Sequence, residues 1–420
     1  MTLNILYLVH ELPVPAVAGH LLRFNEIIEA LPDAAVHVIG YAEQGGAGFA
    51  IGRTSYQPIH GPVRIGRRPF ALLRAIMVSL LTRQPYSIVK YRTAALARAV
   101  RRRCRDSPPD IVIAGVFTQH VVPPGRWTLI ADVHNIEHEL WQAFADHTTG
   151  PRAWFMRREA RLMAQREQAA WQRADGIIAI SADDAAHIAA QRGTAPVWHL
   201  PVAIEPPPIA GGRPRWHVGL IGVWSWRPNA AAIARFATLI APRLRAAGLT
   251  VCVAGPGLDR DIARRLSNLG VDWLGFVPDV GTFYRDVSIV AAPYEIGGGV
   301  RMKVAEALTN GRPVIGTALS FRGIGPGIPS DWVADGAEDL AARLIRFARE
   351  DCTVPGDIAE HHSLALRRER LAALIVALTE PTAGAQRPVR QCHSRLSMAD
   401  VAVHPVLRKG PPAVAGAEPV

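Results

Sequence analysis

One segment of the chain, residues 297 to 317, concentrates side chains that can do chemistry. It holds three glycines in a row, then two cations and one acid, at Gly297, Gly298, Gly299, Arg301, Lys303 and Glu306. The apolar run "VSIVAAPY" before them predicts a buried strand, and the pattern from about Val300 to Asn310 predicts a helix. The glycines therefore lie in a loop that joins the end of a strand to the start of a helix.

This arrangement predicts a site for a phosphate and a sugar. A glycine loop that opens a helix lets an anion approach backbone N–H groups at the positive end of the helix dipole. Arg301 and Lys303 add full charges beside that loop, and Glu306 suits sugar hydroxyls, which can donate hydrogen bonds to it. Together they describe a nucleotide diphosphate. The simpler alternatives are a plain tight turn and a surface ion pair between Lys303 and Glu306.

Strand-like and helix-like segments alternate along two stretches of the chain. Apolar runs such as "LNILYLV", "AVHVIGY", "DIVIAGV", "WTLIADV" and "GIIAIS" alternate with helical patterns, the longest from Ala153 to Ala174. The alternation resumes at "HVGLIGV" and continues through "RPVIGT", with "NAAAIARFATLIAPRLRAAG" as one of its helices. We therefore expect an α/β protein with two doubly wound, Rossmann-like sheets that face each other across a ligand-binding cleft.

Proline and glycine content predicts the domain boundaries. Five prolines and two glycines between residues 200 and 216 predict a linker. We expect an N-terminal domain at 1–200, a linker at 201–216, a C-terminal domain at 217–380 closed by a last helix, and a disordered tail at 381–420.

The composition and the start of the chain indicate the cell compartment in which the protein works. Hydrophobic residues make up 49% of the 420 residues, enough for a large core. The four cysteines form no CxxC pair, which argues against a zinc site or a disulfide framework. The start "MTLNILYLVH" predicts a strand rather than a signal peptide, and "LLRAIMVSLL" is too short to span a bilayer. We therefore expect a cytoplasmic protein.

Positive charge is concentrated in residues 53–105. The net charge is +11, and the interval between Glu43 and Asp106 holds thirteen Arg and Lys residues and no acid. One interpretation is a solvated helix face. The other is attraction to an anionic membrane, which would place the protein peripherally at the inner face. No nucleic-acid-binding motif accompanies the charge, so we do not expect nucleic acid as a partner.

Several ordered motifs resemble those of the family-4 retaining glycosyltransferases of GT-B fold, in the subgroup with a "GGGxRxK…EAL…GxPV…T" signature. "GVWSWRPNAAAIARF" is similar to the segment that opens that family's C-terminal domain, at Gly222, Trp226, Pro228 and Asn229. "DVHNIEHEL" is similar to its "D-x-H-N-x-E" segment, at Asp132, His134, Asn135 and Glu137. The run that ends at Ser181 resembles its connecting helix and strand. The resemblance covers about residues 3 to 380.

The resemblance implies roles for individual residues. His134 matches the histidine that faces the donor sugar, and Arg301 and Lys303 would stabilise the leaving diphosphate, so no metal ion or other cofactor is expected. Glu306 matches the acid that binds the donor ribose. The other expected donor-binding residues are Gly297, Gly298, Gly299, Val300, Gly222 and Thr317. Gly19 matches a glycine loop near phosphate and acceptor. Apart from the resemblance, the position of Arg23 on the first helix predicts contact with an anionic acceptor, and the alternative is that it faces water.

The chain departs from the family pattern at several positions. Gly298 stands where the first acid of the E-x7-E motif would be, and Pro228 stands where a phosphate-binding lysine would be. Ala18 replaces the first glycine of the N-terminal pair, and the usual Asn after the last N-domain strand is missing. The donor sugar is therefore not specified by the resemblance.

The expected activity is transfer of a sugar from a nucleotide-diphosphate sugar to a glycan or lipid-linked acceptor, in surface polysaccharide or glycolipid assembly. Retention is implied by the family alone. A catalytically inactive scaffold of the same fold is one alternative. A nucleotide-sugar epimerase, which would need extra carboxylates in the cleft, is another. A phosphorylase would need a lysine for pyridoxal phosphate, and none is indicated.

Overall fold

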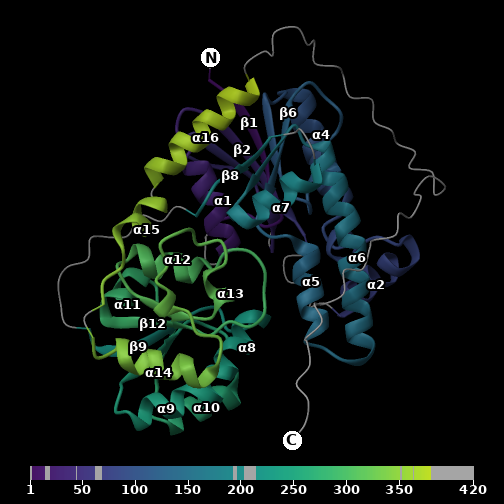
Figure 1. Ribbon diagram of the computed structural model, residues 1–420. Helices are drawn as coiled ribbons and strands as arrows, with labels where there is room; N and C mark the ends of the chain where they lie inside the picture. The colour runs from purple at the N-terminus through teal and green to yellow at the C-terminus, as the bar shows by residue number, and fades with distance from the viewer. Residues whose placement is uncertain are drawn as a thin grey trace, which may run out of the picture.

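The computed structural model describes residues 2–14, 19–43, 45–61, 69–192, 196–202, 214–350, 352–362 and 364–379. They form two α/β units, drawn purple to teal and teal to green in Figure 1. Ala18, most of the predicted linker and the predicted tail at 381–420 lie outside the described residues.

The N-terminal unit contains a sheet of eight strands in the order β3-β4-β2-β1-β5-β6-β7-β8. Their bounds are β1 Asn4–Leu8, β2 Ala35–Ala42, β3 Phe49–Ile51, β4 Thr54–His60, β5 Ile111–Ala114, β6 Thr128–Val133, β7 Gly176–Ala179 and β8 Val197–His199. Neighbouring strands are parallel except for the antiparallel β3–β4 pair. All residues of β5, β6 and β7 are buried, as expected for parallel strands with helices on both faces.

The C-terminal unit contains a parallel sheet of five strands in the order β11-β10-β9-β12-β13. Their bounds are β9 Trp216–Ile221, β10 Val251–Ala254, β11 Asp272–Gly275, β12 Val287–Ala292 and β13 Val314–Gly316. β1 lies between β2 and β5, and β9 lies between β10 and β12, so the strand order reverses at the first strand of each unit. The carboxyl ends of strands at such a reversal are where doubly wound sheets bind ligands.

Helices cover both faces of each sheet (Figure 1). In the N-terminal unit they are α1 Gly19–Glu29, α2 Pro69–Thr82, α3 Tyr86–Val89, α4 Ala94–Asp106, α5 Glu137–Asp146, α6 Gly150–Arg173 and α7 Ala182–Arg192. The later helices are α8 Arg227–Arg235, α9 Ala241–Ala246, α10 Arg260–Asn268, α11 Val280–Asp286, α12 Met302–Thr309, α13 Ala318–Phe321, α14 Ala337–Phe347, α15 Gly356–His361 and α16 Leu364–Thr379. Within the described residues, no helix combines the length and apolar character needed to cross a bilayer.

The helix predicted over "NAAAIARFATLIAPRLRAAG" is interrupted. A π-helical turn at Phe236–Ile240 separates α8 from α9. Pro242, the second residue of α9, has no backbone N–H, so the regular hydrogen-bond ladder cannot continue through it. The helix therefore contains a bulge where the sequence pattern predicts a continuous element.

The last helix, α16, packs on the N-terminal unit, although the predicted domain boundary places it in the C-terminal domain at 217–380. Leu371, Leu374 and Ile375 belong to the same buried cluster as Ile5 and Val36 of the N-terminal sheet. Figure 1 shows α15 and α16 climbing from the green unit to the side of β1 and β2. The chain therefore crosses back, and its last helix joins the two units.

We expect Leu371→Ala and Leu374→Ala each to lower the free energy of unfolding by about 2–5 kcal/mol, because each removes a fully buried side chain. Their side chains are 0% and 1% exposed, whereas Val376 on the same helix is 51% exposed. Val376→Ala is the matched control and should change stability by less than about 0.5 kcal/mol. Urea unfolding followed by circular dichroism measures both effects. A control variant as unstable as Leu371→Ala would show that α16 is not docked as described.

Candidate functional site

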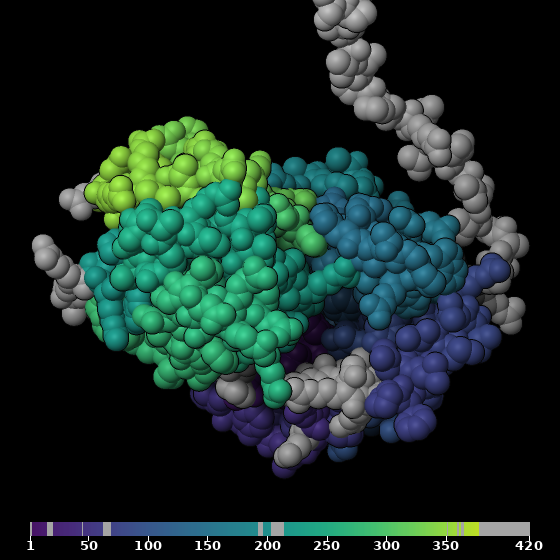
Figure 2. All heavy atoms as spheres, turned by 90° about the horizontal axis from the view of Figure 1, so that it is seen from below, coloured from purple at the N-terminus to yellow at the C-terminus, as the bar shows by residue number. Residues whose placement is uncertain are grey.

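A cavity of about 660 Å³ lies between the two units. Figure 2 shows the corresponding hollow from below, between the green residues of one unit and the indigo and blue residues of the other. The N-terminal unit lines it with residues that follow β1, β5 and β6 and with parts of α1, α3 and α5. The C-terminal unit lines it with residues that follow β9 and β12 and with the start of α12. These positions are the carboxyl ends of strands at the reversal of each sheet.

The cavity brings together most of the residues predicted from the sequence. Its lining includes His134, Arg23, Gly222, Gly297, Gly298, Val300, Arg301 and Lys303. Four other predicted residues are not among its lining residues: Gly19, Gly299, Glu306 and Thr317. Gly19 is the first residue of α1.

Two of the three consecutive glycines make room for neighbouring groups. Gly297 has φ +138°, and a Cβ there would lie 2.5 Å from Nη2 of Arg301. Gly299 has φ +65°, and a Cβ there would lie 1.8 Å from Oδ1 of Asn135 in the N-terminal unit. At Gly298 the nearest atom to such a Cβ is 3.6 Å away, on Leu140. The expected close backbone approach is therefore present, but it is an approach to protein groups.

Arg301 is a buried cation with unused hydrogen-bond donors. Its Nη1 donates to the carbonyl oxygen of Gly298 at 2.6 Å, and its guanidinium lies 5.4 Å from the ring centroid of Tyr294. Nε and Nη2 are buried and have no partner among the described residues. Burial lowers the pKa of Arg301. An anion in the cavity would satisfy these donors through charge-assisted hydrogen bonds.

The helix that begins next to Arg301 adds to this positive potential. α12 starts at Met302, and no side chain caps its N-terminus. Met302 and Lys303, its first two residues, line the cavity. Its first N–H groups have no intrahelical acceptor, so this end of the helix favours negative charge.

Lys303 and Glu306 form the ion pair that was the simpler interpretation of the sequence, but the pair is not on the surface. Nζ of Lys303 lies 2.9 Å from Oε1 and 2.7 Å from Oε2 of Glu306, whose side chain is 7% exposed. The Tyr284 hydroxyl donates to Oε2 of Glu306 at 3.1 Å. Burial raises the pKa of Tyr284 well above its ordinary value, so it remains a donor. Glu306 therefore lies behind Lys303 and balances its charge.

The segment after β9 contributes an aromatic wall, and its cation, Arg227, lies over Phe144 and is not among the lining residues of the cavity. Trp226 is 50% exposed, lines the cavity and packs edge-on against Phe144 at 6.1 Å between ring centroids. Pro228 and Asn229 also line it, and Asn229 Nδ2 donates to the carbonyl of Val223 at 2.9 Å. Trp224, in contrast, is a core residue, 3% exposed.

Thr317 makes hydrogen bonds that support the local fold. Its hydroxyl donates to the carbonyl of Tyr294, and its Oγ1 accepts from the backbone N–H of Ser320 at 3.3 Å. It thereby caps α13 and fixes the loop that carries Tyr294 beneath Arg301. In this structure Thr317 acts through Tyr294 rather than on the cavity.

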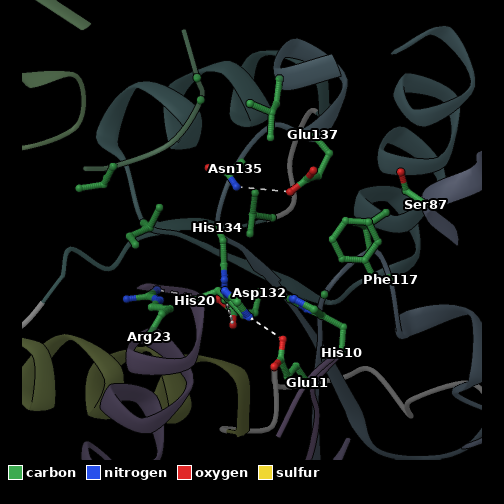
Figure 3. A pocket seen from close by; sticks show the side chains of 18 of the residues that line it. His10, Glu11, His20, Arg23, Ser87, Phe117, Asp132, His134, Asn135 and Glu137 are labelled. Atoms are coloured by element: carbon green, nitrogen blue, oxygen red, sulfur yellow. Dashed lines mark hydrogen bonds and ion pairs between the residues drawn. The ribbon is translucent and has the colours of Figure 1, made fainter. Parts of the chain in front are cut away.

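Asp132 orients His134 on the opposite side of the cavity (Figure 3). Oδ2 of Asp132 lies 2.8 Å from Nε2 of His134 and accepts from the Tyr7 hydroxyl at 2.5 Å. Burial alone would raise the pKa of Asp132, but His134, Arg23 and Tyr7 lower it to about 2. The ionised carboxylate can only accept, so Nε2 of His134 carries a hydrogen and Nδ1 is left for other partners.

Arg23 is buried, and it does not face water. Its side chain is 1% exposed, and Nη1 donates to the carbonyl of Leu200 at 2.9 Å. Nη2 lies 3.9 Å from Oδ1 of Asp132. Arg23 therefore ties α1 to the segment after β8 and stabilises the charge of Asp132.

A polar group after β1 was missed by the sequence analysis. His10, Glu11 and His20 line the cavity (Figure 3). Nε2 of His20 lies 3.2 Å from Oε2 of Glu11, and the rings of His10 and His20 stack at 5.0 Å. Burial lowers the pKa of His10 well below its ordinary value, so His10 is neutral at neutral pH. The signal was present in "LVHEL", where two polar residues directly follow a buried strand.

Glu137 was interpreted only as part of a motif, but it lines the cavity and titrates near neutrality. Burial and the nearby Glu167 raise its pKa to about 7, although Asn135 Nδ2 donates to it at 3.3 Å. The cavity therefore holds a carboxyl group that is partly protonated at neutral pH.

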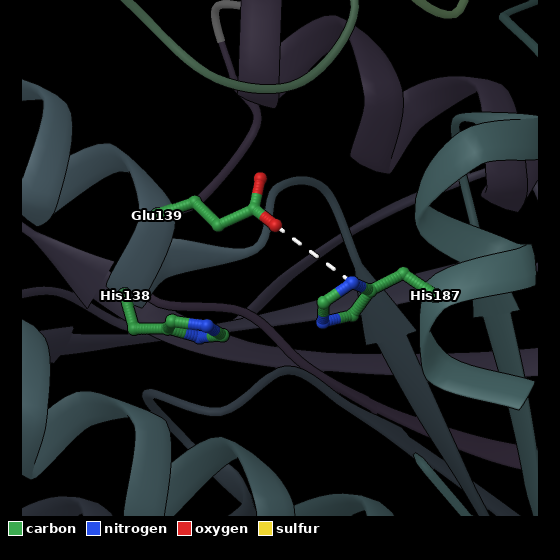
Figure 4. Close-up of side chains that lie close together, drawn as sticks. All are labelled: His138, Glu139 and His187. Atoms are coloured by element: carbon green, nitrogen blue, oxygen red, sulfur yellow. Dashed lines mark ion pairs between the residues drawn. The ribbon is translucent and has the colours of Figure 1, made fainter. Parts of the chain in front are cut away.

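Ion pairs outside the cavity connect the units. Arg322 of the C-terminal unit lies 2.9 Å from Glu139 and 3.4 Å from Asp184 of the N-terminal unit. Glu139 also approaches His138 and His187, and the potential ligand atoms of these three residues lie within 4.8 Å of one another (Figure 4). None of the three lines the cavity, and Arg322 already gives the carboxylate a positive partner. A metal ion held there would not face the cavity.

Comparison with known proteins agrees with this geometry. Residues 216–350 match a family model described as glycosyl transferases group 1. A search of curated proteins found no match. The crystal structure of HepE from Anabaena in complex with UDP and glucose is similar over 90% of this chain and 100% of that chain, with 13% identity and a TM-score of 0.58.

Two further structures show the same similarity. A TarM variant from S. aureus, in complex with Fondaparinux, alpha-GlcNAc-glycerol and UDP, matches 89% of this chain and 97% of its own, with 12% identity and a TM-score of 0.58. WaaG, a glycosyltransferase involved in lipopolysaccharide biosynthesis, matches 90% and 100%, with 16% identity and a TM-score of 0.57. The protein has the GT-B fold. This confirms the predicted pair of Rossmann-like domains, and the group 1 model matches residues 216–350, which lie in the C-terminal one.

We expect Gly299→Ala to push the glycine loop away from the N-terminal unit, because its Cβ would overlap Asn135 and because left-handed backbone costs an alanine about 1–2 kcal/mol. The change should raise the radius of gyration measured by small-angle X-ray scattering. Gly298→Ala is the matched control, since its Cβ would make only ordinary contact. Equal scattering from both variants would show that Gly299 does not set the distance between the units.

We expect Glu137→Gln to change how stability depends on pH. Folded Glu137 holds its proton more tightly than the unfolded chain does, so ionisation destabilises the fold as pH rises from about 4.5 to about 7. The loss amounts to at most about 3 kcal/mol, at 1.36 kcal/mol per pKa unit. Glu137→Gln should remove it, as seen by urea unfolding across this range. Glu338 is 85% exposed and pairs with Arg243 at the surface, so Glu338→Gln should change stability by less than about 1 kcal/mol and keep the wild-type loss between these pH values.

Proposed function

We propose that this protein transfers a sugar from a nucleotide-diphosphate sugar to a glycan or lipid-linked acceptor. The observation that carries the proposal is Arg301, a buried guanidinium that has no anionic partner among the described residues, at the start of α12 and within the segment that matches the group 1 glycosyl transferase model. A diphosphate supplies the missing anion. HepE and TarM, which share the fold, are crystallised with UDP, and this supports a nucleotide as ligand.

The donor would lie along the C-terminal wall. Its diphosphate would accept from Nε and Nη2 of Arg301 and from the N–H groups at the start of α12. Its ribose would approach Lys303 and Glu306, and Trp226 would offer an aromatic face nearby. As the bond to the diphosphate breaks, negative charge grows on the leaving group beside Arg301, and this lowers the barrier.

The acceptor would lie against the N-terminal wall, among His10, Glu11 and His20. His134 faces the space between the two ligands, and its hydrogen bond to Asp132 fixes the ring, so that Nδ1 can contact the transferred sugar. A fixed ring contributes orientation without reorganisation during the reaction. Retention, taken from the family-4 resemblance, requires the acceptor hydroxyl to reach the sugar on the face from which the diphosphate leaves.

The type of sugar transferred, the independence from metal ions and the pathway are inferred from the same family-4 resemblance. We infer a hexosyl-type, metal-independent enzyme of surface polysaccharide or glycolipid assembly that works in the cytoplasm. Arg301 takes the charge-neutralising role that a metal ion would otherwise have.

A nucleotide-sugar epimerase is a second candidate, because Glu11 and Glu137 place carboxyl groups in the cavity. Proton transfer at a sugar carbon needs such groups. Incubation with a donor alone separates the candidates: a transferase hydrolyses the donor slowly, whereas an epimerase returns an isomeric nucleotide sugar.

We expect Arg301→Gln to weaken binding of a nucleoside diphosphate about tenfold or more and to lower the turnover of a matching donor about a hundredfold, because one charge-assisted contact to the leaving group is lost. Calorimetry with a panel of UDP, GDP, ADP and TDP, followed by donor hydrolysis, measures both. Glu306→Ala should weaken nucleoside binding as well.

Arg264→Gln is the matched control, because Arg264 is 73% exposed on α10 and outside the cavity. It should bind and turn over like the wild type. A wild-type protein that binds none of the panel, or an Arg301→Gln variant that binds normally, would rule out the proposed site.

A further inference from the structure

Helix α2 turns its apolar side chains toward solvent. Phe70 is 87% exposed and Leu81 79%, with Leu73, Met77 and Leu80 between them at 38% to 59%. The two buried residues of the helix are small, Ala75 and Ser79. This is the reverse of an ordinary surface helix, whose large apolar residues face the core.

The exposed side chains form a single stripe. Residues 70, 73, 77, 80 and 81 are spaced by three, four, three and one, which places them on one face of a helix. On the opposite face the helix is held by polar contacts, since Arg158 of α6 donates to Oγ of Ser79 at 3.0 Å and to its carbonyl at 2.6 Å. The orientation of α2 is therefore fixed by its small, polar side, and the apolar stripe is left open among the described residues.

The neighbouring face of α6 adds an aromatic ring and cations. Trp154 is 57% exposed, and Arg157 and Arg161 follow it at helical spacing, next to Arg158. Arg74 of α2 and Arg83 after it are exposed as well. The only acids of these two helices, Glu159 and Glu167, are 0% and 1% exposed. The surface of α2 and the first half of α6 is therefore apolar, rimmed by cations and without an exposed acid on either helix.

We infer that this surface docks the protein on an anionic lipid bilayer. Apolar side chains with flanking arginines and no exposed acid are the composition of helices that lie in the headgroup region. The expected attraction of residues 53–105 to an anionic membrane concerned charge alone. The structure adds the apolar stripe, which supplies the part of binding that salt does not screen.

Docking through α2 would also orient the cavity. α3 follows α2 after three residues, and Tyr86, Ser87 and Lys90 of this region line the cavity on its N-terminal side. The acceptor side of the cleft would thus lie next to the bilayer, where a lipid-linked acceptor is held. This orientation rests on the proposed function, whereas bilayer binding does not.

The test is co-sedimentation of the full chain with vesicles of phosphatidylcholine alone and of phosphatidylcholine with phosphatidylglycerol. We expect binding to the anionic vesicles that weakens, without vanishing, at high salt. Combined Phe70→Ser, Leu73→Ser and Leu81→Ser should lower the partition coefficient at least about tenfold. Arg157→Gln with Arg161→Gln should lower it about fivefold per arginine. The arginine variant keeps the inference testable if the serine variant does not fold.

The matched control removes exposed apolar side chains elsewhere. Trp273 and Phe276 of the C-terminal unit are 51% and 64% exposed, and their combined change to serine should leave partition unchanged. Nucleotide binding by all variants should stay at the wild-type level, which separates failure of this inference from failure of the proposed function. Absence of wild-type binding to anionic vesicles overturns the inference. An equal loss of vesicle binding in the control variant would also overturn it. So would an oligomer that forms without lipid and that only the serine changes in α2 dissociate.

Discussion

The site depends on one close contact, the approach of the glycine loop to the N-terminal unit. The backbone at Gly299 comes so near Asn135 and the carbonyl of His134 that no side chain fits between them. The close approach of Gly323 to Ser181 and the ion pairs of Arg322 also hold the two units together. With these contacts made, Arg301 and His134 line one cavity although they belong to different sheets. The contact thus converts two separate ligand-binding edges into a single site.

A buried network of charge supports the N-terminal half of that site. Asp132 holds His134, and Arg23 and Tyr7 hold Asp132. Arg367 of α16 is 3.0 Å from Glu26 of α1, and burial lowers its pKa to about 9. Since buried charges are costly unless they are paired, removal of one member affects the others. The nearby Arg23 also lowers the pKa of Arg367, so the last helix of the chain places a charge beside the group that holds His134.

Local patterns predict the elements of this fold well, and they predict contacts between distant segments poorly. The strand-end rule leads to Arg301 and to the segment after β6, because those residues sit beside obvious buried strands. The same rule applied to "LVHEL" would have found His10 and Glu11. Periodicity could not reveal that α16 crosses to the other unit, because its apolar face suits either core. Periodicity also could not reveal that α2 exposes its apolar stripe, because an apolar helix is predicted to be buried as long as its neighbours are unknown.

The two predicted cations, Arg301 and Lys303, differ in their partners, and this difference could not be predicted from the sequence. On sequence alone, Arg301 and Lys303 are equivalent charges beside a glycine loop. In the structure Lys303 is balanced by Glu306, while the partners of Arg301 among the described residues are a carbonyl group and an aromatic ring. An entering diphosphate would therefore meet one charge without an acidic partner among the described residues and one that is already paired. If the ligand also drew Lys303 away, Glu306 would lose its charged partner and keep the Tyr284 hydroxyl, and ribose hydroxyls could then replace the lysine as donors. If the proposed nucleotide binds here, the position of the acid behind the lysine would couple its two halves, because phosphate binding would free the carboxylate that accepts from the ribose.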